Sequence, residues 1–347
     1  MPAPVRSKLC IIDYMALVRK VLQETFKASP TIQVVATASN ALLARQKILT
    51  TPPDVLLLDL QPPIERDVAC LGELLVHLPL PLVLLTGLDD APRRAVMEAL
   101  HIKREYILAK PRTGLGRGLE AMQGDLESAL RKAYQENLLA WQNTRRPLLS
   151  LPRHCIDAPD RVIAIGASTG GTEALCEILS QLPCETPGMV IVQHMPEGFT
   201  RPFAQRLNAL SALEVKEAAD GDAVCPGRAL LAPGGYQMRL VRASQGYRVR
   251  VTREEKVNGH CPSVDVLMTS VAKNAGARGI GILLTGMGSD GAEGMKAMRH
   301  TGAMTLAQDE RTSVVFGMPK EAYQRGGVEK LVPLQDIAKH LVATLTE

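Results

Sequence analysis

Three residues of the types that carry out acyl transfer each follow a short apolar run in this chain. They are Ser168 after residues 162–165, His194 after residues 189–192 and Asp290 after residues 280–284. A hydroxyl, an imidazole and a carboxylate act together as nucleophile, general base and orienting acid in acyl transfer. Because the carboxyl ends of parallel strands meet at one edge of a sheet, we expect these three side chains to lie close together.

The serine stands in the segment Gly-Ala-Ser-Thr-Gly-Gly (166–171), where a strand turns at once into a helix. Such a turn lifts one side chain above the sheet edge, beside the unpaired N–H groups and the positive dipole of the helix. A dinucleotide-binding loop is the alternative, since the G-x-G-x-x-G motif also links a strand to a helix. When the first and last glycines of that motif are aligned with Gly166 and Gly171, Ser168 takes the place of the middle glycine. The motif also expects an acid near the end of the next strand, where this chain has His194. Both differences favour a nucleophile with a base.

Four polar residues of the N-terminal half are placed in the same way, each after a strand-like run: Asp13, Asp59, Thr86 and Lys110. Two carboxylates, a hydroxyl and an ammonium at one sheet edge suit phosphoryl transfer to an aspartate. Asp13 and Asp59 would bind Mg²⁺, and the hydroxyl and the ammonium would bind the phosphoryl oxygens. Tyr14, directly after Asp13, weakens this magnesium site, because a phenol is a poor ligand for Mg²⁺ at neutral pH.

The elements that must position these residues alternate between strand-like and helix-like patterns. In the N-terminal half we expect strands at 9–12, 32–36, 55–58, 82–85 and 106–108, with helices such as 16–27 and 41–49 between them. Five such repeats predict a parallel, doubly wound (βα)5 sheet. The strands read as continuous apolar runs, as strands buried on both faces do.

The C-terminal half predicts a second, Rossmann-like doubly wound sheet. Its expected strands are 162–165, 189–192 and 280–284, and its expected helices are 172–180, 199–209, 263–275 and 291–299. Residues 230–251 read as short strands around a turn at Pro233-Gly234-Gly235, which predicts a small antiparallel insert. Asp290 can also be interpreted as the N-cap of the helix at 291–299.

A helical and basic segment joins the two halves. The pattern predicts a long helix over 118–143, and residues 144–160 are rich in arginine and proline, as interdomain linkers often are. We therefore expect a receiver-like domain at 7–125, a helix and linker at 126–160, and a catalytic domain at 161–345.

The bulk composition limits the remaining function classes. A chain of 347 residues is long enough for two domains with full cores, and its net charge of +4 is spread along the sequence, so nothing indicates a nucleic-acid partner. No apolar run reaches the roughly 18 residues of a membrane helix. The seven cysteines are scattered without a C-x-x-C pair, which favours reduced thiols and a cytoplasmic location over a disulfide or zinc framework.

The N-terminal half resembles the receiver domain of response regulators. The matching segments are 11–13, 53–59, 85–86 and 109–111. By this resemblance Asp59 is the phosphoacceptor, Thr86 is the switch hydroxyl, and the Lys110–Pro111 peptide bond is cis. A histidine kinase is then the expected phosphoryl donor.

The C-terminal half resembles the chemotaxis protein-glutamate methylesterase/protein-glutamine glutaminase family, whose members join a receiver to a serine-esterase domain. The matching blocks follow in family order: 165–174, 193–196, 198–200, 231–235, 262–267, 284–291 and 316–319. Together with the receiver segments, the resemblance covers nearly the whole chain.

This resemblance implies a substrate and a division of roles. Ser168 would attack the γ-methyl ester of a glutamyl side chain on methyl-accepting chemotaxis receptors. His194 would act as base and then as acid, and Asp290 would orient it. The backbone N–H groups of Met287 and Thr169 would stabilise the oxyanion. The same site would deamidate glutamines, hydrolysis would need no metal or organic cofactor, and phosphorylation would relax a block of the esterase cleft by the receiver.

The receiver half departs from its family at several positions. Receivers usually carry two adjacent acids after the first strand, whereas this chain has Asp13 followed by Tyr14. Lys103-Arg104 replaces a usual glycine–alanine turn and would lie near the signalling face of the receiver. We therefore expect phosphoryl control to be weakened or lost. A non-catalytic signalling module and an esterase of a chemosensory pathway other than swimming remain as alternative functions.

Overall fold

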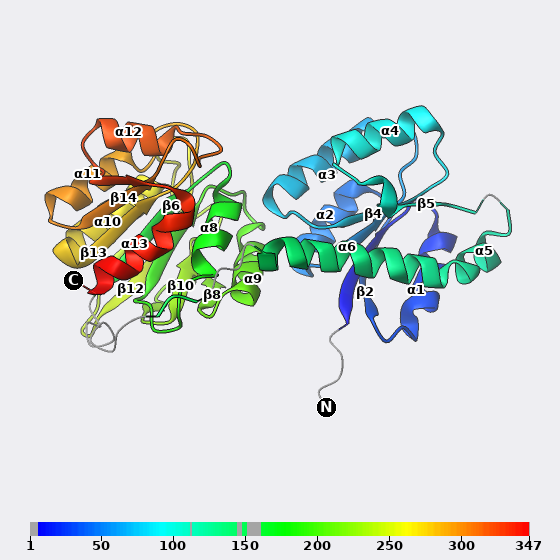
Figure 1. Cartoon of the computed structure of the whole chain (residues 1–347), viewed down its shortest axis with the longest axis horizontal. Coiled ribbons are helices and arrows are strands. Elements are labelled where there is room, and N and C mark those ends of the chain that lie inside the picture. The colour runs from blue at the N-terminus through cyan, green and yellow to red at the C-terminus, as the bar shows by residue number, and fades with distance from the viewer. Residues whose placement is uncertain (1–5, 112, 144–147, 151–160, 347) are drawn as a thin grey trace. The chain divides into compact units, whose positions relative to one another are not determined.

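Five parallel strands form the centre of the N-terminal unit, Met1–Asn143. In the computed structural model, which describes residues 6–111, 113–143, 148–150 and 161–346, these strands are β1 (Ser7–Ile12), β2 (Ile32–Ala38), β3 (Val55–Leu58), β4 (Leu82–Thr86) and β5 (Ile107–Ala109). Their order in the sheet is β2-β1-β3-β4-β5, with helices on both faces (Figure 1). This is the flavodoxin-like order of doubly wound folds, and it confirms the predicted (βα)5 class.

The helices of this unit are α1 (Ala16–Lys27), α2 (Ala41–Thr50), α3 (Glu65–His77), α4 (Asp90–Ala99), α5 (Leu115–Ala121) and α6 (Gln123–Asn143). A short 3-10 turn, η1 (Arg104–Tyr106), precedes β5. The single helix that we expected over 118–143 is instead divided at Met122. The N–H of Met122 donates to the carbonyl oxygens of Gly118 and Leu119, and α6 begins at the next residue.

Helix α6 also moves the expected domain boundary. We had assigned 126–160 to a connecting segment, but the side chains of Leu126, Leu130 and Ala133 on α6 are buried in the N-terminal unit. Their spacing of three to four residues gives α6 an apolar stripe that packs on β3 and β4. Residues 144–147 and 151–160 of the expected linker lie outside the described residues.

The C-terminal unit, Thr144–Glu347, is built on seven parallel strands in the order β15-β14-β13-β6-β7-β10-β8. They are β6 (Val162–Ala167), β7 (Met189–Gln193), β8 (Glu214–Glu217), β10 (Arg228–Leu231), β13 (Gly279–Leu283), β14 (Met304–Gln308) and β15 (Lys330–Val332). The chain proceeds from β6 in one direction along the sheet and returns to β13 on the other side of β6. Strands β6 and β13 therefore form the switch point at which doubly wound sheets bind ligands.

Helices cover both faces of this sheet (Figure 1). They are α8 (Gly171–Leu179), α9 (Thr200–Leu210), α10 (Val264–Ala275), α11 (Ala292–His300), α12 (Met318–Gln324) and α13 (Leu334–Thr346). Helices α10 and α11 pack together, and α13 packs on α8. No helix in the described part of the chain is long and apolar enough to cross a membrane.

The antiparallel insert exists, but its predicted strands and turn were partly wrong. It comprises β9 (Ala223–Val224), β11 (Gln237–Arg242) and β12 (Tyr247–Thr252), and its hairpin turn lies at residues 243–246. Leu230 and Leu231 belong to β10 of the parallel sheet. The predicted turn at Pro233-Gly234-Gly235 is present, since the N–H of Tyr236 donates to the carbonyl oxygen of Pro233 at 3.3 Å, but it connects β10 of the parallel sheet to β11 of the insert. Gly234 also packs closely, because a Cβ there would lie 2.6 Å from the carbonyl oxygen of Pro196.

Substituting Gly166 by alanine should destabilise the C-terminal unit. An added Cβ would lie 2.3 Å from Cγ1 of Val264, and overpacking of this kind costs about 1–3 kcal/mol. Gly72→Ala is the matched control, because Gly72 lies inside α3 with no atom within 4 Å of an added Cβ. That substitution should stabilise the N-terminal unit by about 0.5–1 kcal/mol. Hydrogen exchange measured on peptides of β6 and α3 separates the two effects, and unchanged protection of β6 in Gly166→Ala would contradict the packing argument.

Candidate active site and phosphoacceptor pocket

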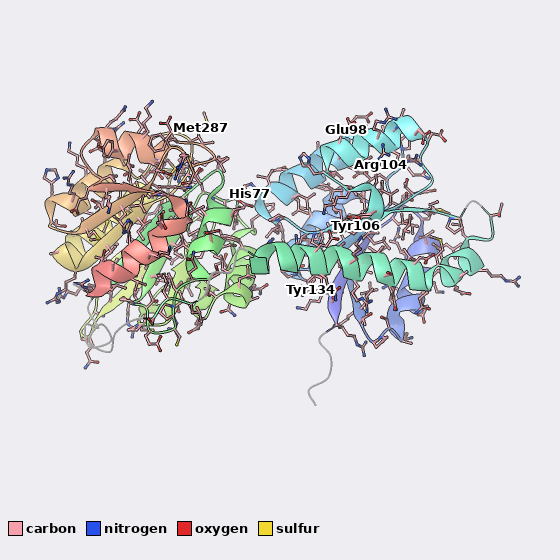
Figure 2. All side chains as sticks on the ribbon, in the orientation of Figure 1. His77, Glu98, Arg104, Tyr106, Tyr134 and Met287 are labelled. Atoms are coloured by element: carbon pink, nitrogen blue, oxygen red, sulfur yellow. The ribbon has the colours of Figure 1, made fainter. Side chains whose placement is uncertain are left out.

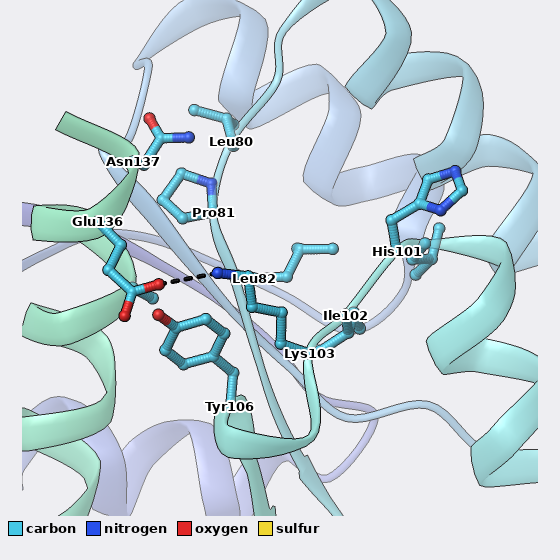
Figure 3. A pocket seen from close by; sticks show the side chains of 11 residues that line it. Leu80, Pro81, Leu82, His101, Ile102, Lys103, Tyr106, Glu136 and Asn137 are labelled. Atoms are coloured by element: carbon cyan, nitrogen blue, oxygen red, sulfur yellow. Dashed lines mark hydrogen bonds and ion pairs between the residues drawn. The ribbon is translucent and has the colours of Figure 1, made fainter. Parts of the chain in front are cut away.

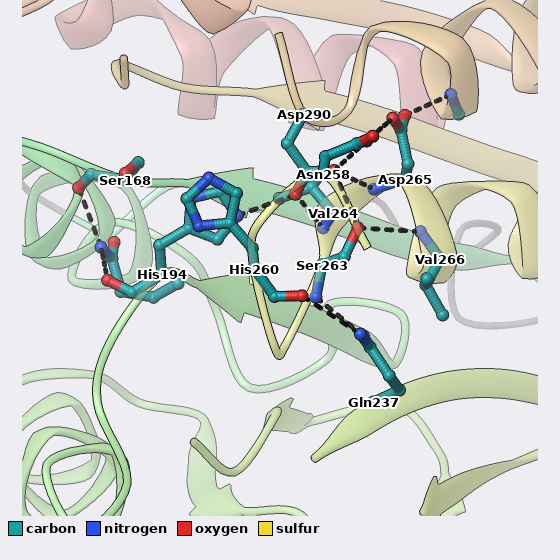
Figure 4. Close-up of polar contacts among 12 residues, drawn as sticks. Ser168, His194, Gln237, Asn258, His260, Ser263, Val264, Asp265, Val266 and Asp290 are labelled. Carbon is teal, nitrogen blue, oxygen red and sulfur yellow. Dashed lines mark hydrogen bonds and ion pairs between the residues drawn. The ribbon is translucent and has the colours of Figure 1, made fainter. Parts of the chain in front are cut away.

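The three predicted acyl-transfer residues come together at the carboxyl ends of β13, β6 and β7, which are neighbours in the sheet (Figure 4). Ala167 pairs with Gln193 in the register of β6 and β7, so Ser168 and His194 follow as neighbours. The N–H of His194 donates to the carbonyl oxygen of Ala167 at 2.9 Å. The N–H of Ser168 donates to the carbonyl oxygen of Thr285 at 3.0 Å. These backbone hydrogen bonds continue the pairing of β13, β6 and β7 past the last residues of the strands.

The ring of His194 is held by Asp290. Its Nε2 lies 2.8 Å from Oδ2 of Asp290, and both side chains are buried. Because an ionised carboxylate only accepts hydrogen bonds, Nε2 carries the hydrogen and Nδ1 carries the lone pair. His194 Nδ1 is buried and has no hydrogen-bond partner among the described residues. The imidazole can therefore accept a proton at Nδ1 while Asp290 holds the opposite side of the ring.

The carboxylate of Asp290 accepts several hydrogen bonds besides that of His194. Its other donors are Asn258 Nδ2 at 3.0 Å, Ser263 Oγ at 2.7 Å, and the backbone N–H groups of Val264 at 2.7 Å and Asp265 at 3.3 Å. Burial raises the pKa of Asp290, but the hydrogen bonds from His194, Asn258, Ser263 and Val264 outweigh it and lower this pKa to about 2. Asp290 is therefore ionised at neutral pH.

Asp290 does not cap the helix that follows it. The N-cap of α11 is Gly291, at φ 95°, and it makes no side-chain hydrogen bond. The carboxylate instead accepts from Val264 and Asp265 at the start of α10, where the helix dipole favours a negative charge. Ser263, the N-cap of α10, also donates its hydroxyl to Asp290.

Two further residues beside the site were missed in the sequence. The rings of His194 and His260 are stacked, with centroids 3.7 Å apart and an interplanar angle of 4° (Figure 4). Asn258 donates to both Asp265 and Asp290. Both residues belong to a tight turn, Val257–His260, whose Asn-Gly pair was the available signal, since that dipeptide favours two-residue hairpins.

The loop that carries Met287 passes directly beside the serine. A Cβ at Gly286 would lie 2.7 Å from Cβ of Ser168. The side chain of Met287 is 73% exposed and points away from the unit (Figure 2). Among the hydrogen bonds of the described residues, none uses the backbone N–H of Met287 or Thr169. Both N–H groups are thus available to an oxyanion at the serine.

Comparison with known proteins identifies the family. A model of the CheB methylesterase family matches residues 163–341. A protein-glutamate methylesterase/protein-glutamine glutaminase of Syntrophotalea carbinolica is 47% identical over 99% of this chain and 99% of its own length. The chain belongs to the CheB methylesterase family. A Pseudomonas aeruginosa relative, protein-glutamate methylesterase/protein-glutamine glutaminase 2, is 42% identical over 96% of this chain and 95% of its own length.

The fold comparison agrees with this assignment. The crystal structure of the CheB methylesterase catalytic domain of Thermotoga maritima covers 53% of this chain and 98% of its own length, with 37% identity and a TM-score of 0.52. The family resemblance predicted from the sequence is thereby confirmed.

The N-terminal unit of this CheB-family chain brings the predicted phosphoacceptor residues together. Lys110 Nζ contacts Oδ2 of Asp13 at 2.7 Å and Oδ2 of Asp59 at 2.5 Å, and all three side chains are buried. Thr86 is buried and accepts from the N–H of Leu88. Burial raises the pKa of Asp59 to about 6, and Lys110 acts in the opposite direction. For Lys110, the two carboxylates outweigh burial and raise the pKa of the ammonium.

This pocket does not fit Mg²⁺ well. Both carboxylates face the ammonium of Lys110, and Oδ1 of Asp13 accepts from the N–H of Met15 at 2.7 Å. Tyr14 presents its ring to Lys110, whose Nζ lies 5.2 Å from the ring centroid. Among the described residues there is no group of three or more His, Cys, Asp or Glu side chains placed to hold a metal. The Lys110–Pro111 bond is also not one of the cis peptide bonds of the described residues, contrary to our expectation.

Lys103 of the basic pair Lys103-Arg104 precedes β5, so it lies at the opposite edge of the sheet from Asp59. Lys103 lines a cavity of about 260 Å³ at the amino ends of β4 and β5, together with Tyr106 (Figure 3). Its Nζ contacts Oε2 of Glu136 on α6 at 3.0 Å. This ion pair is exposed, so it contributes little to the packing of α6 against the sheet.

Removing Lys110 should destabilise the N-terminal unit. Lys110→Met leaves two buried carboxylates without their cation, and breaking a buried ion pair in this way costs about 3–5 kcal/mol. Adding Asp59→Asn to Lys110→Met should recover part of that loss. Hydrogen exchange of β3 and β4 peptides in the full chain measures the loss of stability in Lys110→Met and its partial recovery in the double variant. Lys103→Met, which removes an exposed lysine, is the control and should change little. A Lys110→Met chain as stable as wild type would show that the ion pair is not formed.

Proposed function

We propose that this CheB-family chain hydrolyses glutamate γ-methyl esters, and deamidates glutamines, on methyl-accepting chemotaxis receptors. The observation that carries the proposal is the buried His194–Asp290 pair beside Ser168 at the switch point of the sheet. Relatives at 40–47% identity bear the name protein-glutamate methylesterase/protein-glutamine glutaminase, which supports this substrate class. The free thiols of Cys10 and Cys176 in the core agree with a reducing, cytoplasmic location.

The mechanism uses groups of this chain and water. Ser168 Oγ attacks the ester carbonyl carbon while Nδ1 of His194 accepts its proton. Asp290 keeps the hydrogen on Nε2 and stabilises the imidazolium. The backbone N–H groups of Met287 and Thr169 donate to the oxyanion. The imidazolium then protonates the departing methoxide, and methanol leaves an acyl-serine.

Water completes the cycle. His194, neutral again, accepts a proton from water at Nδ1 as the water oxygen attacks the acyl carbon. The tetrahedral intermediate collapses, the proton returns to Ser168 Oγ, and glutamate is released. With a glutamine substrate, ammonia replaces methanol as the leaving group, and the acyl-serine is the same.

We also propose that phosphoryl control of this enzyme is weakened. The phosphoacceptor Asp59 is clamped by Lys110, and Tyr14 stands where a receiver usually has its second acid. A receiver acts as a switch when phosphorylation biases a two-state equilibrium. A carboxylate that is already paired with a buried ammonium, and that has Asp13 but no second acid beside it to bind a metal, gains little from a phosphoryl donor such as a histidine kinase.

Ser168→Ala should abolish methanol release from methylated receptor, because no other group of the site can form the acyl intermediate. Asp290→Asn should lower kcat by about 10⁴-fold, because it removes the acceptor that fixes the tautomer of His194. Ser211→Ala is the matched control and should keep wild-type activity, since Ser211 lies beyond the end of α9 and its hydroxyl donates to the carbonyl oxygen of Leu213. Equal methanol release from wild type and Ser168→Ala would eliminate the enzyme in favour of a non-catalytic signalling module.

Tyr14→Asp should raise the affinity of the N-terminal unit for Mg²⁺ by supplying a second carboxylate beside Asp13. Tyr14→Phe removes the phenol without adding a ligand and should bind Mg²⁺ as weakly as wild type. Titration calorimetry with Mg²⁺ measures the affinities, and labelling of Asp59 by a small phosphoryl donor measures the consequence. Stoichiometric, Mg²⁺-dependent labelling of Asp59 in the wild-type chain would refute weakened phosphoryl control.

A further inference from the structure

The ring of His194 has two faces, and one of them is covered by His260. The planes of the two imidazoles are nearly parallel, at 4°, and the rings are stacked with centroids 3.7 Å apart. We propose that His260 is a positioning residue that holds the imidazole of His194 at the tilt required for proton transfer with Ser168. This inference rests on the proposed esterase function and adds to it a residue that acts only through the base.

The need for such a residue follows from how His194 is held. Its ring makes one hydrogen bond, from Nε2 to Asp290, and Nδ1 has no partner among the described residues. A single hydrogen bond fixes the distance of a ring from its acceptor but leaves the ring free to rotate about that bond. Rotation would change the direction in which the lone pair of Nδ1 points. A flat surface against one face of the ring removes this freedom.

The backbone around His260 is rigid enough to provide that surface. The N–H and carbonyl groups of Val257 and His260 exchange two hydrogen bonds of 2.9 Å, which close the turn. Asn258 and Gly259, the central residues, have φ of 55° and 81°, as the type I′ turn requires. The carbonyl oxygen of His260 accepts from Gln237 Nε2 at 3.2 Å.

The same turn is tied to the acid. The side-chain amide of Asn258 donates to Oδ1 of Asp290 at 3.0 Å and to Oδ2 of Asp265 at 2.7 Å. One turn thus contacts the acid through Asn258 and the base through His260. A displacement of the turn would shift both partners of the His194–Asp290 pair.

The surroundings of His260 favour a neutral ring. Burial and the neighbouring His194 lower the pKa of His260, as does Lys256, while Asp290 acts in the opposite direction. A neutral ring does not repel the imidazolium that forms on His194 during the reaction. Its π face attracts a cation instead.

The test compares substitutions that keep or remove the flat ring. His260→Ala should lower kcat for methanol release by about 10²-fold, since misplacing a reacting group by 1 Å has this effect, with KM within about two-fold of wild type. His260→Phe keeps a ring face without ring nitrogens and should restore kcat to within about three-fold. The downfield proton resonance of the Nε2–H···Asp290 hydrogen bond should be lost in His260→Ala and kept in His260→Phe.

A backbone variant tests the same idea without changing His260. Gly259→Val places a β-branched residue at a positive φ, and an added Cβ there meets no atom within 4 Å, so its effect acts through the backbone of the turn. It should lower kcat as His260→Ala does. Gly246→Val is the matched control, because Gly246 has a φ of 66° and equally open space but lies in the hairpin between β11 and β12. It should leave kcat unchanged.

The outcomes separate this inference from the proposed function. If His260→Ala keeps wild-type kcat, or if His260→Phe is as impaired as His260→Ala, the positioning role is refuted while the esterase stands. If wild type releases no more methanol than Ser168→Ala, the proposed function fails. In that case the resonance still decides whether His260 holds the ring, since its survival in a folded His260→Ala chain would overturn the inference.

Discussion

A single buried negative charge organises the catalytic edge of this protein. The carboxylate of Asp290 is 1% exposed, and a charge in that position is tolerated only when every oxygen is hydrogen-bonded. Its donors come from three places in the chain: His194 after β7, Asn258 in the Val257–His260 turn, and the amino end of α10. The requirement to satisfy one carboxylate therefore fixes the positions of a strand end, a turn and a helix at once.

The two parallel sheets place similar residues at equivalent edges, but the partners of their carboxylates differ. Asp290 is satisfied by neutral donors, among them the Nε2–H of His194, which leaves the other ring nitrogen with its lone pair. Asp13 and Asp59 each place one oxygen, Oδ2, against the ammonium of Lys110. The first arrangement creates a base, whereas the second holds a carboxylate in an internal ion pair.

The predictions from the sequence agreed best with the structure where they depended on residue types close together along the chain. Ser168, His194 and Asp290 were found because each follows an apolar run, and the parallel strands then brought them to one edge. The insert at 230–251 was assigned less well. Leu230 and Leu231 belong to a parallel strand, but two apolar residues fit a parallel strand and an antiparallel strand equally well, so their types could not show to which sheet they belong. The end of the N-terminal domain was placed at residue 125, too early in the chain. The apolar stripe of α6 could be recognised in the sequence, but the sequence does not show that this stripe packs on the sheet of the N-terminal unit.

By itself, the sequence determined the family and the two doubly wound sheets, and it predicted a nucleophile, a base and an acid, since these inferences depend on residue type and spacing along the chain. Only the tertiary structure decided which nitrogen of His194 meets Asp290, that Asp290 binds the start of α10 instead of capping α11, and that His260 covers the base. These contacts join residues that lie far apart in sequence. Their geometry depends on how helices and turns pack over the sheet edge, which no local pattern of residues specifies.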